Sequence, residues 1–323
     1  MTLVGVGHAL ADAFAFVEDD VPKTLGLHPG SFNQVPDYRM RAIMSTLGSP
    51  PLAAGGSAAN TVKLAARLGL NAHFVGQCGH DEAGQIFESE MLQAGVKVSL
   101  TRSDSPTGLC VTFLTPAPLR TVATFRSASG NLAEGLLGDT LLAAADVVVV
   151  EGYLFDEPAF VGELLARCEA RHKDVALDLG EGSTERHKDE ILRQLATGVV
   201  RYLFLRASDA ATLTGLDAAG ALTALSTPGT TVVIKTGEEE YLVRSEGKVS
   251  KLGLAGDPAV DTSGTGDGFQ AGFLWAVSRG WTAEEACRAG GLVAGCVGEE
   301  AGTRVGPARW AQLHQDLLAL AQR

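Results

Sequence analysis

The second half of the chain alternates between short valine-rich runs and stretches with helical character, and this alternation limits the fold more than any other feature. Apolar runs with helical segments between them recur at Val147 to Val150, Val175 to Leu179, Tyr202 to Leu205 and Thr231 to Lys235. Uninterrupted apolar strands of this kind are typical of a parallel sheet that is buried on both faces. The pattern therefore predicts an α/β fold with a mostly parallel central sheet.

The first half starts in the same way but then departs from this alternation. Leu3 to Leu10 predicts a buried first strand, Asn71 to Gly76 a further strand, and Asp81 to Ala94 a helix. Two segments, at about 13–48 and 96–127, instead carry short strands with few helices between them, including Val96 to Arg102, Leu109 to Thr115 and Thr121 to Arg126. We expect these segments to form a small sheet that covers the active site as a lid, inserted in a single domain spanning residues 1–323.

Charge and cysteine content exclude several classes of function. The chain of 323 residues has a formal net charge of −12 and no block of lysine or arginine, which argues against nucleic acid and anionic membranes as partners. The 5 cysteines are odd in number and lack C-x-x-C spacing, which argues against a disulfide framework or a zinc site. With no long apolar run and no secretory pattern, a cytoplasmic protein is expected.

A glycine-rich turn, Asp261 to Phe269, leads into an apolar run with a helical period. Phe269, Phe273 and Val277 fall on one face of a helix, so Gly264 to Asp267 should lie at the helix N-terminus. Such a terminus binds anions, and phosphate in particular. Asp267 would then accept a proton from an attacking hydroxyl during phosphoryl transfer. The alternative interpretation is that Asp267 only caps the helix.

A second glycine motif, Gly55-Gly56-Ser57-Ala58-Ala59-Asn60, precedes another predicted helix. Ser57 is the predicted N-cap and Gly69 the residue after the helix. The paired glycines would allow a close approach to a ligand, and Asn60 offers a donor and an acceptor to a hydroxyl. Tight packing of helix on strand is the alternative explanation for the glycines. Asp12, placed at the end of the first strand, either faces a ligand or caps a loop.

Other phosphate- and nucleotide-binding signatures are absent from the sequence. No G-x-x-x-x-G-K-[ST] occurs, and Gly5-Val6-Gly7 lacks the third glycine of a dinucleotide fingerprint. Neither a G-x-S-x-G nor an H-E-x-x-H motif is present. These motifs therefore offer no alternative to phosphoryl transfer at the glycine turn.

The two glycine motifs together resemble the two signatures of the PfkB, or ribokinase-like, carbohydrate kinases. They are Gly55-Gly56-Ser57-Ala58-Ala59-Asn60 and Asp261-Thr262-Ser263-Gly264-Thr265-Gly266-Asp267, and the resemblance extends over essentially the whole chain. Val6-Gly7-His8-Ala9-Leu10-Ala11-Asp12 and Pro106-Thr107-Gly108-Leu109-Cys110 resemble the adenosine kinase-like branch. The resemblance implies a three-layer α/β/α sandwich with a small β lid. It also implies an ATP-dependent kinase that phosphorylates a primary hydroxyl of a sugar or nucleoside.

The resemblance further implies a role for each matching position. Asp267 would be the general base, and the N–H groups of Gly264, Thr265, Gly266 and Asp267 the anion hole. The substrate would be held by Asp12, Gly55, Gly56, Asn60 and His8. ATP, accompanied by Mg²⁺, would be bound by Thr236, Gly237, Arg206 and Asp209, and a monovalent cation such as K⁺ by Asp261. A homodimer through the lid is a further expectation.

Two departures from the family pattern bear on these roles. Arg206 and Asp209 stand where the family carries the asparagine and glutamate of Asn-x-x-Glu. Asp209 could still reach Mg²⁺ through water, and Arg206 could contact phosphate. The alternative is a non-catalytic relative that binds a sugar or nucleoside and has a regulatory role. His8 replaces the asparagine usual in adenosine kinase-like chains, which leaves the substrate open.

Overall fold

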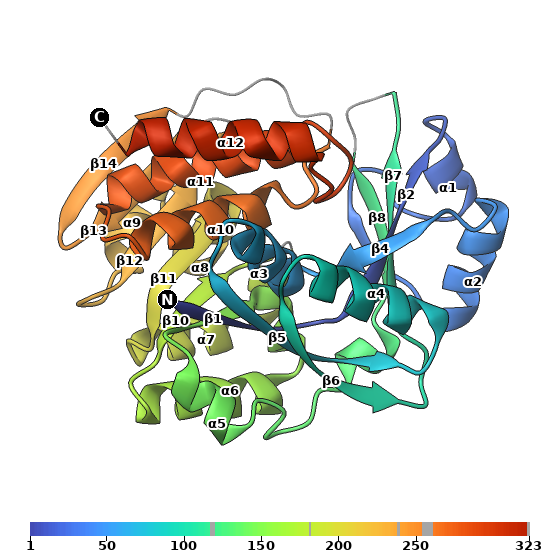
Figure 1. Ribbon diagram of the computed structural model, residues 1–323, viewed down its shortest axis with the longest axis horizontal. Helices are drawn as coiled ribbons and strands as arrows, with labels where there is room; N and C mark the ends of the chain where they lie inside the picture. The colour runs from blue at the N-terminus through green and yellow to red at the C-terminus, as the bar shows by residue number, and fades with distance from the viewer. Residues whose placement is uncertain (117–119, 181, 238–239, 254–260, 322–323) are drawn as a thin grey trace.

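The computed structural model describes residues 1–116, 120–180, 182–237, 240–253 and 261–321 (Figure 1). Its larger sheet contains nine strands: β1 (Thr2–Val6), β5 (Asn71–Gly79), β6 (Lys97–Ser103), β9 (Val147–Glu151), β10 (Asp174–Asp178), β11 (Val200–Arg206), β12 (Thr231–Lys235), β13 (Glu240–Ser245) and β14 (Lys248–Gly253). Their order in space is β14-β13-β12-β11-β10-β9-β1-β5-β6. In this sheet the neighbouring strands β12, β11, β10, β9, β1, β5 and β6 are all parallel. The hairpin of β13 and β14 is antiparallel and lies at one edge.

Helices cover both faces of this sheet, and each face has its own apolar core. One face is covered by α3 (Ser57–Arg67), α4 (Glu82–Gln93), α10 (Thr265–Val277), α11 (Ala283–Gly298) and α12 (Pro307–Leu320). The other is covered by α5 (Asp139–Ala144), α6 (Pro158–Ala170), α7 (Ser183–Ala196), α8 (Ala207–Thr214) and α9 (Ala218–Ala224). Because β9 to β12 are buried on both faces, their sequences are almost continuously apolar. The predicted three-layer α/β/α fold is confirmed.

A second sheet of five strands stands beside the large one, on the right of Figure 1. Its strands are β2 (Leu10–Phe16), β3 (Phe32–Gln34), β4 (Leu52–Gly55), β7 (Gly108–Leu114) and β8 (Thr121–Phe125), in the order β3-β8-β7-β2-β4. A small separate core lies between this sheet and α2 (Asp37–Thr46), with α1 (Val21–Thr24) nearby in the chain. Two 3₁₀ turns, η1 (Ser127–Gly130) and η2 (Gly152–Asp156), follow β8 and β9.

Two predictions about the strands were wrong. Val96 to Arg102 does not belong to the small sheet, because β6 pairs in parallel with β5 and extends the large sheet. The helix α4 between them makes β5–α4–β6 a regular βαβ unit. The predicted first strand, Leu3 to Leu10, is divided: β1 ends at Val6, and after three residues β2 starts the small sheet. Asp12 therefore lies within β2 of the small sheet, not at the end of a strand of the large one.

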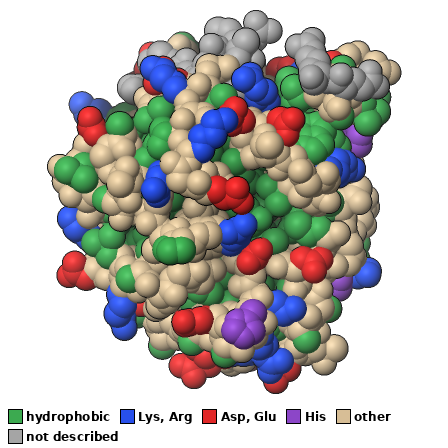
Figure 2. Space-filling view, turned by 90° about the vertical axis from the view of Figure 1, so that its left-hand side faces the viewer, with side chains coloured by type: hydrophobic (Ala, Val, Ile, Leu, Met, Phe, Trp, Pro, Cys, Tyr) green, Lys and Arg blue, Asp and Glu red, His purple; other side chains and the backbone are tan. Residues whose placement is uncertain are grey.

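Figure 2 shows one face of the surface. On the face shown in Figure 2, basic and acidic side chains are interspersed, and no continuous basic patch is seen there. Among the helices of the described ranges, none combines the length and the apolar character needed to cross a membrane.

The helix that begins at the glycine turn, α10, is fixed by close backbone packing against α11. A Cβ on Gly272 would lie 2.7 Å from the carbonyl oxygen of Ala289 and 2.7 Å from Val293 Cγ2. By contrast, Gly295 on the exposed side of α11 has no neighbouring atom within 4 Å of such a Cβ. A methyl group is therefore excluded at the first position and accommodated at the second.

We predict that Gly272→Ala lowers the free energy of unfolding by about 1–3 kcal/mol, because overpacking forces the two helices apart. The matched variant Gly295→Ala should raise it by about 0.5–1 kcal/mol, as alanine does in an unobstructed helix. Urea denaturation of both variants measures the difference. Equal stability of the two would contradict the close contact of α10 with α11.

Candidate active site

A cleft of about 800 Å³ lies between the two sheets. The last residues of β9, β10, β11 and β12, which are Glu151, Asp178, Arg206 and Lys235, all line it. This is the edge at which open α/β sheets bind ligands. The predicted residues that line the cleft are His8, Asp12, Gly56, Asn60, Arg206, Thr236, Gly237, Gly264, Thr265, Gly266 and Asp267.

The glycine turn forms the N-terminus of α10, as predicted. Gly264 is the N-cap, with φ +75°, and a Cβ there would lie 2.4 Å from Thr303 Cγ2. Only glycine suits both the left-handed conformation and the close neighbour. Thr265, Gly266 and Asp267 form the first turn, whose N–H groups lack helical partners by geometry. Thr265, Gly266 and Asp267 line the cleft, so the N-terminus of α10, which carries the positive end of the helix dipole, faces it. The N–H of Thr265 also lies 3.3 Å from the carbonyl oxygen of Thr262.

The carboxylate of Asp267 does not cap its own helix. It accepts hydrogen bonds from Ser57 Oγ at 2.8 Å and from Asn60 Nδ2 at 3.0 Å, both on α3. The Oδ1 atom of Asn60 in turn accepts from Thr303 Oγ1 at 3.1 Å. Burial raises the pKa of Asp267 to about 6, against the opposing effect of the two hydrogen bonds. This site thus holds a buried carboxylate that is ionised near neutral pH.

The prediction that Ser57 is the N-cap of α3 was wrong. Gly56 is the N-cap, with φ +99°, and Ser57 is the first helical residue. A Cβ on Gly56 would lie 2.2 Å from the carbonyl oxygen of His8. The hydroxyl of Ser57 is therefore available to Asp267 instead of to the helix terminus.

The paired glycines make room for Asp12. A Cβ on Gly55 would lie 2.0 Å from the carboxyl carbon of Asp12, so any other residue would displace that side chain. Burial raises the pKa of Asp12 to about 7; nearby Lys63 opposes the shift and Asp267 adds to it. Gly55 itself does not line the cleft but shapes it through Asp12.

Two other predicted residues, Asp209 and Asp261, do not line the cleft and are held by contacts within the protein. Asp209 is buried, accepts from Thr184 Oγ1 at 2.9 Å and from Arg206 Nε at 3.1 Å, and closes a capping box at the start of α8. Asp261 is also buried and accepts from the N–H groups of Ser263 and Gly302, both at 2.9 Å. Asp261 thereby fastens the glycine turn to the segment that follows α11.

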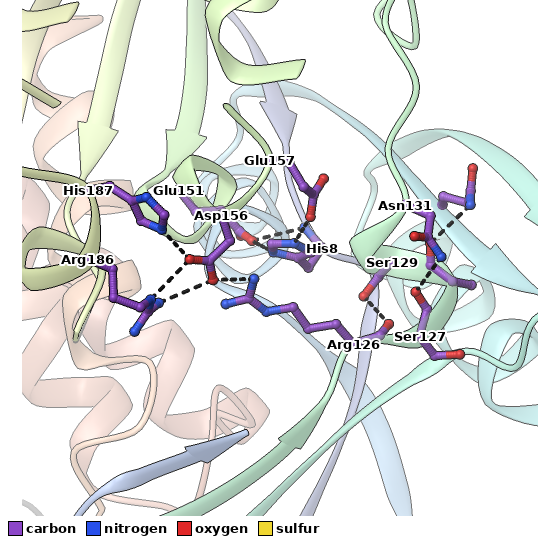
Figure 3. Close-up of polar contacts among 12 residues, drawn as sticks. His8, Arg126, Ser127, Ser129, Asn131, Glu151, Asp156, Glu157, Arg186 and His187 are labelled. Carbon is purple, nitrogen blue, oxygen red and sulfur yellow. Dashed lines mark hydrogen bonds and ion pairs between the residues drawn. The ribbon is translucent and has the colours of Figure 1, made fainter. Parts of the chain in front are cut away.

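His8 lines the cleft and is buried, and contacts engage both of its ring nitrogens (Figure 3). Nδ1 contacts Glu151, and Nε2 lies 3.1 Å from Glu157 Oε1. Burial opposes a charge on the imidazole, but the two carboxylates outweigh it and raise the pKa of His8 to about 9. His8 is thus an imidazolium whose nitrogens point at protein carboxylates.

Sequence reasoning missed several residues of the cleft, among them Glu151, Asp178, Thr303 and Arg120. Glu151 and Asp178 each end an apolar strand, and an acid at that place was a usable signal. The pKa of Asp178 is raised to about 8 by burial and by Asp267 and Asp209. Thr303 and Arg120, whose Nε donates to Ser263 Oγ at 2.8 Å, lie in loops and gave no signal.

Comparison with known proteins identifies the family of the chain. A family model described as pfkB family carbohydrate kinase matches residues 39–310. Ribokinase from Haemophilus influenzae is 24% identical over 250 residues, covering 74% of this chain and 79% of that protein. Adenosine kinase 1 from Arabidopsis thaliana is 24% identical over 315 residues, covering 89% and 91%.

The crystal structure of adenosine kinase from Sinorhizobium meliloti superposes with a TM-score of 0.89 at 26% identity, covering 98% of this chain and 99% of that one. The family match spans well over half of the chain, and the fold agrees with that of the solved structure. The chain therefore belongs to the PfkB family of carbohydrate kinases and is an adenosine kinase-like carbohydrate or nucleoside kinase.

Proposed function

We propose that the protein transfers the γ-phosphoryl group of ATP to a primary hydroxyl of a sugar or nucleoside, with Asp267 as general base. The observation that carries this proposal is the position of the Asp267 carboxylate. It is buried at the N-terminus of α10, held from the side by Ser57 and Asn60, and lies in one cleft with Asp12. A carboxylate beside an anion-binding turn is suited to deprotonating a hydroxyl that attacks a phosphate.

The substrate would lie between the small sheet and α3. Asp12 and Asn60 would accept and donate hydrogen bonds to its hydroxyls, while Gly56 allows its close approach. The reacting hydroxyl would give its proton to Asp267 as its oxygen attacks the γ-phosphorus, and the bond from that phosphorus to the bridging oxygen of ADP breaks. Holding both reactants in line supplies much of the catalysis in such reactions.

The transferred group would be stabilised by the first turn of α10. The N–H groups of Gly264, Thr265, Gly266 and Asp267 would surround its oxygens, and each such donor is typically worth about 10²–10³-fold in rate. Arg120, in the loop before β8, donates a hydrogen bond to Ser263 beside this turn and would add a positive charge. The small sheet would thus complete the site when it closes as a lid.

Thr236, Gly237 and Arg206 would bind the nucleotide phosphates, since they line the cleft at the ends of β11 and β12. The described ranges hold no group of three or more His, Cys, Asp and Glu side chains that could enclose a metal. Mg²⁺ does not need such a cage, because it keeps water and phosphate ligands. It would neutralise phosphate charge, and Asp209 would meet it through water.

Asp261 would contribute to a monovalent cation site behind the glycine turn. Its carboxylate already accepts two N–H groups, and its own N–H lies 3.4 Å from the carbonyl oxygen of Gly298. Carbonyl groups between Val297 and Gly302 would supply the remaining ligands of an ion such as K⁺.

One observation favours a second candidate, a non-catalytic relative that binds a sugar or nucleoside. Asp209 and Arg206 are joined in the capping box of α8, so part of the phosphate-binding end is engaged in helix capping. The intact arrangement around Asp267 favours the enzyme.

A transfer assay with ATP against ribose, fructose, adenosine, inosine, guanosine and cytidine separates the two candidates. We predict transfer to at least one acceptor, and a loss of several orders of magnitude in kcat for Asp267→Asn with substrate binding largely retained. Thermal stabilisation by an acceptor without any transfer would support the binding protein. Unchanged turnover of Asp267→Asn would show that Asp267 is not the base.

The pKa values predict the pH dependence of turnover. Because burial disfavours the ionised carboxylate, Asp267 is protonated below about pH 6 and cannot act as a base. We therefore expect kcat/KM to fall as the pH is lowered through about 6. Asp12 titrates at about 7 and its carboxylate interacts with that of Asp267. Asp12→Asn should therefore weaken substrate binding and move the fall in kcat/KM that belongs to Asp267 to a lower pH, because a neighbouring negative charge is lost. A limb near pH 4 would contradict the raised pKa of the base.

A further inference from the structure

Glu151 is a buried carboxylate that the proposed reaction does not use. It is the last residue of β9 and only 2% exposed. Its Oε2 atom accepts from the N–H of Ala58 at 2.9 Å, and its Oε1 atom accepts from the N–H of His8 at 3.0 Å and also contacts the imidazole ring. A buried carboxylate with this many donors is fixed in place.

His8 is the residue that Glu151 contacts through Oε1, the carboxylate oxygen that does not bind Ala58. It lies in the three-residue connection from β1 to β2, where the chain passes from the large sheet to the small one. Figure 3 shows its ring between Glu151 and Glu157. A Cβ on the preceding residue, Gly7, would lie 2.5 Å from Glu151 Oε2, so a glycine there is what allows the carboxylate to enter.

The contact with Ala58 connects this pair to the proposed base. Ala58 lies in the first turn of α3, between Ser57 and Asn60, which both donate to Asp267. The same helical turn is therefore held from behind by Glu151 and holds Asp267 in front. A small displacement of this turn would move both donors of the base at once.

We infer that Glu151 and His8 form a buried ion pair that positions the first turn of α3, and through it the Asp267 carboxylate, from the connection between the two sheets. The inference rests on the proposed role of Asp267 as base. Glu151 and His8 are positioning residues here, because neither needs to touch the reacting atoms.

Glu151 also acts on Asp267 through its charge, and this effect on the pKa of Asp267 can be measured separately from a structural contact. Lys63 on α3 lowers the pKa of Asp267, whereas Glu151 raises it. Asp12 on β2 and Asp178 on β10 also interact electrostatically with Asp267. Neutralising Glu151 should therefore lower the pKa of Asp267.

The test compares Glu151→Gln with Glu157→Gln. Both remove a carboxylate that contacts His8, but only Glu151 reaches α3. The pKa of Asp267 is measured by NMR titration of protein whose aspartate carboxyl groups are labelled with ¹³C. The Asp267→Asn variant, which lacks the signal of Asp267, assigns it. This readout needs no turnover, so it remains valid if the wild-type protein transfers no phosphate and the proposed function fails. On an accepted substrate, kcat and the KM for ATP are measured as well.

We expect Glu151→Gln to lower the pKa of Asp267 and to reduce kcat by about 100-fold, the scale of loss for a misplaced catalytic group, with the KM for ATP unchanged. Glu157→Gln should leave the pKa of Asp267 at its wild-type value. An unchanged pKa in Glu151→Gln, or equal shifts in the two variants, would overturn the inference.

Glu151→Asp gives a second test should Glu151→Gln fail to fold. It keeps the charge but withdraws the carboxylate from Ala58 by one methylene. We expect it to lose kcat while the pKa of Asp267 stays near that of the wild type. Full kcat in this variant would overturn the positioning role.

Discussion

The hydrogen bonds from Ser57 and Asn60 to the carboxylate of Asp267 are the interaction on which the site depends. They join the N-termini of α3 and α10, which are remote in sequence and packed side by side on one face of the large sheet. Two helix termini that face one carboxylate create a local field favourable to negative charge. Burial raises the pKa of that carboxylate toward neutrality, where a general base is most effective.

Close backbone approach is what makes this arrangement possible. Gly55 leaves room for Asp12, Gly56 for the carbonyl of His8, and Gly264 for Thr303, with virtual Cβ distances of 2.0, 2.2 and 2.4 Å. The glycines near the cleft therefore shape it by admitting neighbouring groups, more than by packing helix on strand. The alternative explanation of Gly55 and Gly56 as helix–strand packing positions is thereby replaced by a specific one.

The sequence predicted what local patterns encode, and it missed what long-range contacts decide. The apolar runs of β9 to β12 and the start of α10 were predicted correctly, because burial and helix geometry leave a periodic trace. The membership of β6 in the large sheet was missed, since an edge strand and a lid strand have similar local patterns. The local pattern predicts Ser57 as an N-cap, because its actual partner, Asp267, comes close only after folding.

A double-mutant cycle between Asn60 and Asp267 tests the central claim most directly. The kcat for phosphoryl transfer is measured at saturating substrate for the wild-type protein, Asn60→Ala, Asp267→Asn and the double variant. If Asn60 acts on the chemical step by holding the base, the double variant should be no slower than Asp267→Asn alone. Independent, multiplicative losses would show that the two residues do not work as one unit and would contradict the account.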